Sequence, residues 1–336
     1  FGGADGKPRR YSQFLFTDIA THQRERALVS KRFTPRRIES WEPRIRQVAV
    51  DLLEPLVERG ACDIIQDFAA RFPMALISEI MGIPEEDRDM VRGWSDDYLA
   101  RDPGDPTPPE RAVLAEQALA DYFMAARRER ERQPREDLLT VLATAPVDAG
   151  SGPAPLPEGH YVGNCTMLVI AGNETTTKLI ANAVLQLYRN PDQRRDLIEH
   201  PDVIPNAVEE TLRYDAPSQW QNRRVAKDVT LHGVTIPENA FCGLVTGAAC
   251  RDPRRYADPD RYDVRREVGM HLALGWGSHL CLGKTLARME GRIALEEIFA
   301  RFPDYEVDES GLERVYVTNV AGYCKMPIRY EAGRGA

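Results

Sequence analysis

The sequence has few cysteines for its length, and none is spaced as part of a metal or redox pair. Six cysteines lie at positions 62, 165, 242, 250, 281 and 324 of 336 residues. The absence of any Cys-x-x-Cys pair argues against a zinc site and a dithiol redox motif. Their low density does not fit a disulfide-stabilised scaffold, and it favours a reducing, cytoplasmic location.

Long apolar runs and an excess of positive charge are also missing. No stretch reaches the roughly 20 apolar residues that a membrane-spanning helix requires, and residues 1–6 do not read as a signal peptide. A net charge of -8 gives no general attraction to nucleic acid or anionic membranes. We therefore expect neither as a partner. The chain starts at Phe1 rather than Met, which leaves room for a preceding segment.

What is present is an ordinary globular composition with one unusual loop. The chain is 43% hydrophobic and 29% charged, shows no internal repeat, and is long enough for one large domain or two. Cys281 lies among glycines 275, 277 and 283, just before residues with helical spacing. A helix N-terminus favours a thiolate, and a thiolate is a good ligand for haem iron. The alternative is a buried structural cysteine in a glycine-rich turn.

The ordered pattern Gly275-x-Gly277-x-His279-x-Cys281-x-Gly283 resembles the haem-binding loop of the cytochrome P450 family, the haem-thiolate monooxygenases. Family members usually carry Phe where this chain has Leu274, and both side chains are apolar. The resemblance implies that Cys281 is the axial ligand of the iron in haem b. It also implies that Gly275, His279 and Gly283 contact that cofactor.

The spacing of residues 160–189 predicts one long, mostly apolar helix whose centre, Ile170 to Thr177, is rich in poor helix formers. On local rules alone this centre is a kink with Glu174 facing water. Ala171-Gly172-x-Glu174-Thr175-Thr176 also resembles the oxygen-binding groove of the family. The resemblance implies that Ala171 and Gly172 let haem and dioxygen approach. It implies that Glu174 and Thr175 are catalytic and deliver protons.

Three basic residues match the propionate-binding positions of the family. His22 and Arg26 are four apart and share a helix face, which by spacing alone is a solvated basic face. The resemblance implies that this pair binds a haem propionate, and that Arg223 binds one too. The neighbouring Arg224 leaves that register open. Family members have a longer segment before His22, with a first helix and part of a sheet, so the sequence leaves open whether that sheet is complete here.

Glu210 and Arg213 are three apart on another predicted helix, residues 203–214, where they can form an ion pair. By itself this is a common surface pattern. It also resembles the structural Glu-x-x-Arg motif of the family. Arg261, in Asp258-Pro-Asp-Arg261, is then the candidate third member, and all three residues should be buried, paired and important for haem incorporation.

The remaining segments frame these motifs. We expect helices over 34–60, over 63–81 (limited or bent by Pro73) and within 83–100, then a Pro-rich loop, 101–109, resembling the mobile lid of the family. A long helix follows, and its charge run 127–132 should be a solvated face. Residues 229–236 predict a hairpin that turns at His232-Gly233. By resemblance, residues 218–221 line the substrate side of the haem.

The expected fold is therefore mainly α with small β-sheets: a single haem domain over 1–336, shortened at its N-terminal part. The expected function is insertion of one oxygen atom from dioxygen into an organic small molecule. No strand precedes a Gly-x-Gly-x-x-Gly fingerprint, so electrons should come from a separate ferredoxin and ferredoxin reductase. These should dock near Lys284, Arg288 and Arg292. The alternatives are a peroxide-driven peroxygenase, which retention of Glu174 and Thr175 argues against, and a non-catalytic haem sensor or carrier.

Overall fold

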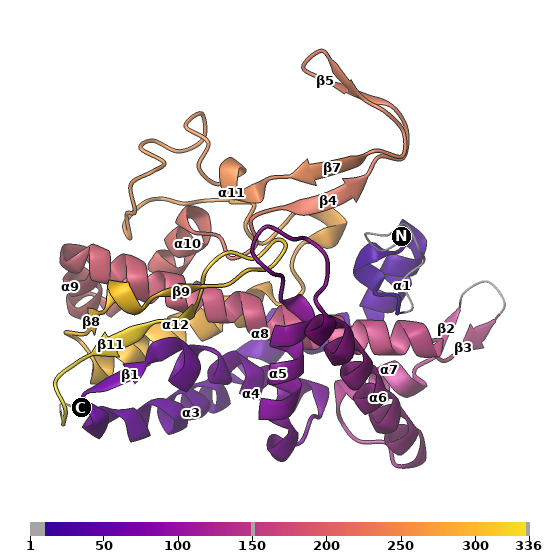
Figure 1. The fold of residues 1–336 in the computed structure, drawn as a ribbon, viewed down its shortest axis with the longest axis horizontal. Helices are drawn as coiled ribbons and strands as arrows, with labels where there is room; N and C mark the ends of the chain where they lie inside the picture. Colours follow the sequence, from indigo (N-terminus) through magenta and orange to yellow (C-terminus); the bar gives the residue numbers. More distant parts are fainter. Residues whose placement is uncertain (1–10, 149–151, 334–336) are drawn as a thin grey trace.

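Helix α8 (Glu158–Arg189) runs through the centre of the molecule, and most other helices pack around it (Figure 1). The computed structural model describes residues 11–148 and 152–333. Nearly every residue of α8 from Tyr161 to Leu187 is buried, so its apolar run is explained by packing on several sides. Asn190-Pro191 ends it, because a proline cannot continue a helix and restricts the residue before it. The prediction of one long helix over 160–189 is confirmed.

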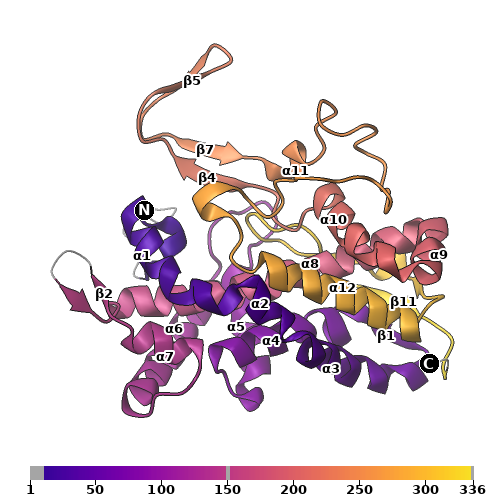
Figure 2. The same cartoon turned by 180° about the vertical axis from the view of Figure 1, so that it is seen from behind.

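The helices that surround α8 come from both halves of the chain. Helices α4, α6, α10 and α12 contact it directly, and α3 packs on α12, as Figure 2 shows from behind. The helices are α1 (Ile19–Ser30), α2 (Pro35–Glu39), α3 (Glu42–Leu53), α4 (Arg71–Met81), α5 (Arg88–Leu99), α6 (Glu110–Arg132), α7 (Leu138–Thr144), α9 (Pro191–Glu199), α10 (Ile204–Tyr214), α11 (Thr246–Ala249) and α12 (Lys284–Arg301).

The strands form small antiparallel sheets at the margins of this helical body. A three-stranded sheet has the order β1-β11-β8, and the other pairs are β9–β10, β2–β3, β4–β7 and β5–β6. Within the described residues β4 therefore has one partner strand, β7. The strands are β1 (Ala61–Asp63), β2 (Val147–Asp148), β3 (Pro153–Ala154), β4 (Gln221–Arg224), β5 (Val229–Leu231), β6 (Val234–Ile236), β7 (Phe241–Leu244), β8 (Glu306–Val307), β9 (Glu313–Arg314), β10 (Tyr323–Lys325) and β11 (Pro327–Arg329).

Hairpin β5–β6 stands away from the body in Figure 1 and turns at His232 and Gly233, which both have positive φ. This confirms the predicted hairpin over 229–236. His232 adopts the left-handed region without being glycine, as tight two-residue turns require of both central residues.

Two of the predicted helices are broken where prolines occur. The segment 34–60 divides into α2, α3 and a 3-10 stretch, Glu54–Arg59, because Pro43 and Pro55 each lie at the start of a new helical segment. The segment 63–81 begins as strand β1 and a π-helical stretch, Ile64–Ala69, before α4. Pro73 lies in the first turn of α4, where its missing N–H costs no intrahelical hydrogen bond.

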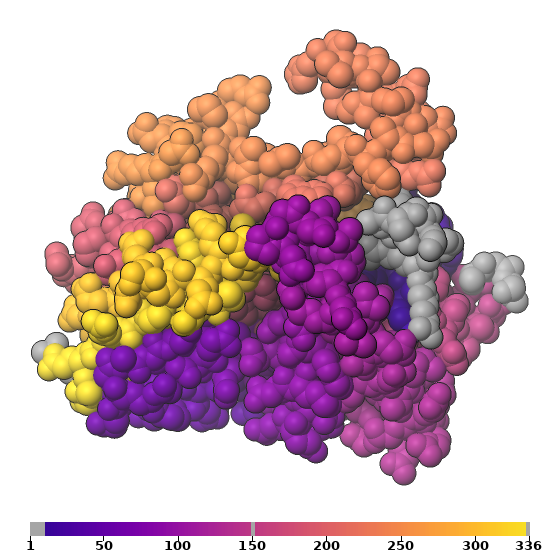
Figure 3. Space-filling view, viewed as in Figure 1, coloured from indigo at the N-terminus to yellow at the C-terminus, as the bar shows by residue number. Residues whose placement is uncertain are grey.

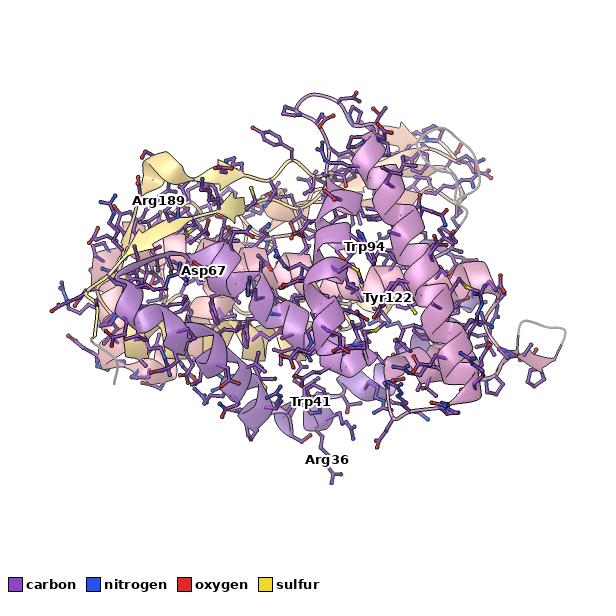
Figure 4. The ribbon with its side chains drawn as sticks, turned by 60° about the horizontal axis from the view of Figure 1, so that its bottom comes forward. Arg36, Trp41, Asp67, Trp94, Tyr122 and Arg189 are labelled. Atoms are coloured by element: carbon purple, nitrogen blue, oxygen red, sulfur yellow. The ribbon has the colours of Figure 1, made fainter. Side chains whose placement is uncertain are left out.

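The charge run at the end of α6 is not a fully solvated face. Arg130 is 2% exposed and donates to Asp137 and to the carbonyl of Gly82, while Arg127 donates to the carbonyl of Leu156. These arginines join α6 to its neighbours, which their spacing could not reveal. Earlier in α6, Tyr122 lies against Trp94 of α5, as seen in Figure 4, with the ring centroids 6.2 Å apart.

Candidate functional site

The loop before α12 is shaped by glycines and closed by a backbone hydrogen bond. Gly275 and Gly277 have φ of 75° and 66°, and a Cβ at Gly275 would lie 3.0 Å from the carbonyl oxygen of His279. The N–H of Cys281 donates to the carbonyl of Leu274 over 2.7 Å. Helix α12 then starts at Lys284 with Gly283 as its N-cap residue. The prediction that Cys281 directly precedes a helix is confirmed.

The surroundings of Cys281 act on its thiol in opposite directions. Burial raises the pKa of the Cys281 thiol, while the N–H of Gly283 and the positive charges of Arg26, Arg288 and Lys284 lower it. The net direction is upward, because burial outweighs the N–H group and the positive charges that favour the thiolate. A bound metal ion would supply the missing charge, because coordination deprotonates a thiol.

A cluster of basic side chains gathers beside this loop from three parts of the chain. The rings of His22 on α1 and His279 lie 4.4 Å apart, and Arg26 donates to the carbonyl of Leu280 over 2.5 Å. Desolvation, followed by the charges of His22, Arg223 and Arg26, lowers the pKa of His279 to about 4. Part of this drop arises because a further positive charge beside Arg26 and Arg223 is unfavourable, and an anionic group among these residues would relieve it.

The hydrogen bonding of this basic cluster (His22, Arg26, Arg223 and His279) points the same way. His22 is 1% exposed, yet among the described residues neither of its ring nitrogens has a hydrogen-bond partner, and Nδ1 of His279 has none either. The hydrogen bonds recorded for Arg26 and Arg223 go to carbonyl oxygens. Buried polar atoms are normally paired, so this cluster fits an anionic ligand that accepts several hydrogen bonds.

Helix α8 is uncovered at one place in its buried stretch. Between Tyr161 and Leu187 every residue is buried except Met167, Ile170, Ala171, Gly172 and Thr175. Residues 167, 171 and 175 are four apart and line one face. This opening lies at the segment expected to form an oxygen-binding groove.

The individual residues of this segment differ from expectation in two ways. A Cβ at Gly172 would lie 2.7 Å from Cγ1 of Ile77, so glycine is needed there for close packing of α8 on α4. Glu174 is only 8% exposed, and its carboxylate pairs with Lys178, 3.0 Å away and 3% exposed. The interpretation of Glu174 as a water-facing residue at a kink is wrong. Thr175 donates its hydroxyl to the carbonyl of Ala171 over 2.9 Å.

The donor set of the site fits haem rather than a bare metal ion. Residues 11–148 and 152–333 contain no group of three or more His, Cys, Asp or Glu side chains that could hold a metal. Cys281 would be a single protein ligand, which suits a haem iron because the macrocycle itself supplies further ligands. The basic cluster suits the carboxylates of such a group.

The Glu210–Arg213 pair is buried, but its third member is not the predicted one. Both side chains are 0% exposed, and Arg213 donates to both Glu210 oxygens over 2.6 and 2.8 Å. Arg266 donates to Glu210 over 3.2 Å and is 11% exposed. The side chain of Arg261 is 68% exposed and lies near Asp263, so its assignment is wrong. Arg261 contributes only its carbonyl, which accepts from Arg213.

Two chain segments lie side by side next to β4. Ser218 bridges Val320 as an isolated antiparallel pair, and Gln219 donates from its backbone N–H to the carbonyl of Asn319 over 2.8 Å.

The Pro-rich loop between α5 and α6 covers the centre of one face in Figure 3. The start of this loop contacts the C-terminal region of the chain, because the N–H of Arg101 donates to the carbonyl of Tyr316 over 2.8 Å.

Sequence reasoning missed three residues that shape the site. Lys178 holds Glu174. Desolvation and the charge of Glu174 raise the pKa of Asp96 on α5 to about 6. Glu209 accepts hydrogen bonds from His271 and Arg288, and these outweigh the effect of burial and lower its pKa to about 2. Of these three, only Lys178 could have been found from the sequence, because it lies four residues after Glu174 on the same helix.

A helical body around a Gly-rich cysteine loop, a basic cluster and an opening on the central helix define a haem-thiolate protein. Comparison with known proteins agrees. The Cytochrome P450 family model matches residues 110–316. A putative cytochrome P450 123 of Mycobacterium tuberculosis is 40% identical over 96% of this chain and 80% of its own length. The cytochrome P450 monooxygenase PikC of Streptomyces venezuelae is 35% identical over 96% of this chain and 77% of its own.

Solved structures show the same likeness. A mutant of P450 EryK in complex with erythromycin B superposes with a TM-score of 0.89 and 33% identity over 99% of this chain and 85% of that one. The chain belongs to the cytochrome P450 family. It is a haem-dependent monooxygenase, of a family that acts on small molecules with dioxygen and a redox partner. Among the described residues, no helix is long and apolar enough to cross a membrane.

Proposed function

We propose that this P450 inserts one oxygen atom from dioxygen into a hydrophobic, natural-product-like small molecule, using electrons from a ferredoxin and its reductase. The basic cluster beside the Cys281 loop carries the cofactor assignment, because its unpaired buried nitrogens require an anion that haem propionates would supply. The proposal treats residues 1–336 as a single haem domain. It places the protein in the cytoplasm, which six free cysteines support.

The residues divide the work in the following way. Haem b, when bound, supplies the iron that activates dioxygen. Cys281 binds the iron through sulfur, and Gly275 and Gly283 give the loop its shape. His22, Arg26, Arg223 and His279 orient the propionates. Ala171, a small residue on the uncovered face of α8, would leave room for haem and dioxygen next to that helix. Glu210, Arg213 and Arg266 fix the segment that precedes the cysteine loop.

Thr175 and Glu174 handle protons in this proposal. The Thr175 hydroxyl donates to the Ala171 carbonyl, so its lone pairs remain free to accept a hydrogen bond from a water at the opening. Glu174 is held by Lys178, and the half-exposed Asp96 lies close enough to feel its charge. In this proposal Glu174 relays protons from solvent toward the water at Thr175.

The relatives support a natural-product substrate without fixing it. EryK was solved with erythromycin B. The two alternatives stay distinguishable by experiment: a peroxygenase turns over with peroxide and no reductase, and a sensor or carrier turns over with neither. A haem-spectral screen with terpenoids, steroids, macrolides and fatty acids would identify the substrate class.

The test of the assignment is the spectrum of the reduced protein under carbon monoxide. A strongly red-shifted Soret band reports thiolate ligation, and Cys281→Ala should abolish it because a methyl group cannot bind iron. Cys165→Ala is the matched control, since Cys165 is buried in α8 far from the loop in sequence. A normal band in Cys281→Ala would overturn the assignment.

The redox partner is proposed to dock beside the cysteine loop, through a smaller basic patch than the sequence indicated. Arg288 is paired with Glu209 and Arg292 with Glu42 and Glu296, so their charges are largely neutralised. Lys284 has no acidic partner within ion-pairing distance in the described chain. It lines a shallow hollow with Trp276, which is 67% exposed. This combination of charge and an exposed aromatic suits an acidic partner.

Lys284→Glu should slow electron transfer from a ferredoxin at low salt, with an effect that shrinks as salt screens the charges. Stopped-flow reduction of the ferric protein measures this. Arg292→Gln, which removes a charge already paired, serves as the control. Equal rates for Lys284→Glu and the parent at low salt would exclude this patch.

A further inference from the structure

Glu25 is a buried carboxylate on the side of α1 that the basic cluster does not use. It lies one residue before Arg26, so it points about 100° away around the helix, and it is 3% exposed. A buried charge costs free energy unless it is paired and hydrogen-bonded. Nothing in the proposed chemistry requires a carboxylate here.

Within the part of the chain that the structure describes, the side-chain partners of Glu25 come from the first turns of α8. Nδ1 of His160 lies 2.5 Å from Oε1 of Glu25, and the side-chain amide of Asn164 donates to Oε2 over 2.7 Å. His160 and Asn164 are four residues apart and share one face of α8. Both carboxylate oxygens of Glu25 are thereby engaged, and α1 is attached to the central helix.

The same network reaches His22 from a second side. The side-chain oxygen of Asn164, which is 0% exposed, accepts the backbone N–H of Phe14 over 2.7 Å. The ring of Phe14 packs against that of His22, with the centroids 5.8 Å apart. One amide side chain thus holds both the helix that carries His22 and the aromatic ring that packs on it.

We propose that Glu25, clamped by His160 and Asn164, is a positioning residue that seats His22 and Arg26 for the haem propionates, with the protonation of His160 setting how firmly. This rests on the proposed function, in which those two residues bind the propionates. Glu25 touches neither cofactor nor substrate and acts through α1.

His160 has a single charged neighbour that governs its titration. The hydrogen bond that His160 donates to Glu25 raises the pKa of His160, burial opposes this rise, and the negative charge of Glu25 adds to it. Among the described residues packed around His160, no other charged group shifts it. The stabilisation is fully present below the ordinary histidine pKa of 6.5 and is lost as pH rises through the raised value. The clamp therefore loosens at alkaline pH.

The experiment measures haem loss from the holoprotein to excess apomyoglobin, from about pH 6 to about pH 9. In the parent, loss should quicken roughly tenfold once His160 is neutral, the size expected for losing a charged hydrogen bond. His160→Gln should lose haem quickly at every pH. His160→Lys keeps a cation opposite Glu25, so it should retain haem with a flat profile.

His200→Gln is the matched control, because His200 also pairs with a carboxylate, Asp196, 3.0 Å away, but on the exposed surface of α9. It should follow the parent. A His160→Gln profile that overlays the parent's would overturn the proposal, and so would a pH-dependent His160→Lys. If the parent binds no haem at all, the proposed function fails instead. Amide exchange of α1 in the apoprotein then decides the clamp, which requires α1 to open more readily at alkaline pH in the parent than in His160→Lys.

Discussion

At the scale of single residues, the hydroxyl of Thr175 donates its proton in a hydrogen bond within α8, and its lone pairs remain able to accept one. It donates to the carbonyl four residues earlier on α8, a bond that a threonine in a helix commonly makes. The side chain nevertheless lies on the face of α8 that is uncovered. Its contribution to proton delivery would therefore be to hold a water rather than to give up its own proton.

Thr175→Val keeps the shape of the side chain and removes the oxygen, so it should keep haem and substrate binding but lose coupling. Reductant and dioxygen should still be consumed, with hydrogen peroxide released in place of product, and product per reductant should fall by about tenfold or more, within the range for general acid–base groups. Thr175→Ser, which retains the hydroxyl, should stay near the parent. Equal coupling in Thr175→Val and the parent would show that the hydroxyl is not needed.

At the scale of elements, α4 and α8 approach so closely at Gly172 that a side chain there would be overpacked. The site of a Cβ at Gly172 is 2.7 Å from a carbon of Ile77, and a core this well packed cannot absorb an extra methyl without moving. A glycine inside a helix is otherwise unfavourable, so replacing it by alanine normally raises stability. A loss of stability on such a replacement therefore reports close packing.

Gly172→Ala should destabilise the protein by about 1–3 kcal/mol, the usual cost of overpacking, measured by chemical denaturation. Gly93→Ala in α5 is the control, since an added Cβ meets nothing within 4 Å there. That change should stabilise by up to about 1 kcal/mol through helix propensity. A neutral Gly172→Ala would mean that the two helices separate easily.

At the scale of the whole molecule, a carboxylic acid lies in the interface between α12 and α8. Glu290 is 1% exposed, and its Oε1 has no partner among the described residues. Burial raises the pKa of Glu290 to about 8, opposed by a hydrogen bond with Thr176. At neutral pH the native state therefore holds a proton that the unfolded chain releases.

A native state that binds the extra proton loses stability as pH rises between the ordinary glutamate pKa of 4.5 and the raised value. The slope from this group is at most about 1.4 kcal/mol per pH unit. Glu290→Gln removes the titration while keeping a polar side chain of similar size, so its stability should fall less than the parent's from about pH 5 to about pH 8. Urea denaturation across that range measures the free energy of unfolding of both proteins. If the two proteins lose stability equally as pH rises, Glu290 does not carry the extra proton of the native state.

The cysteine loop and the central helix could be predicted because their signals are local. A Gly-rich turn before helical spacing, and a break of helix propensity within an apolar run, are properties of neighbouring residues. The partner of Glu210 could not be predicted, because Arg261 and Arg266 are equally basic and only the path of the loop buries one of them. The broken helix over 34–60 could have been predicted from Pro43 and Pro55, whose missing N–H groups outweigh the apolar periodicity.

The sequence by itself determined the family, the cysteine, the long helix and the positions of the basic residues, since each depends on residue type and short spacing. Only the tertiary structure decided that Glu174 pairs with Lys178, that Gly172 faces α4, and that His22, Arg223 and His279 meet. Those facts depend on contacts between segments far apart in the chain, whose free energies are set by burial and charge in the assembled core.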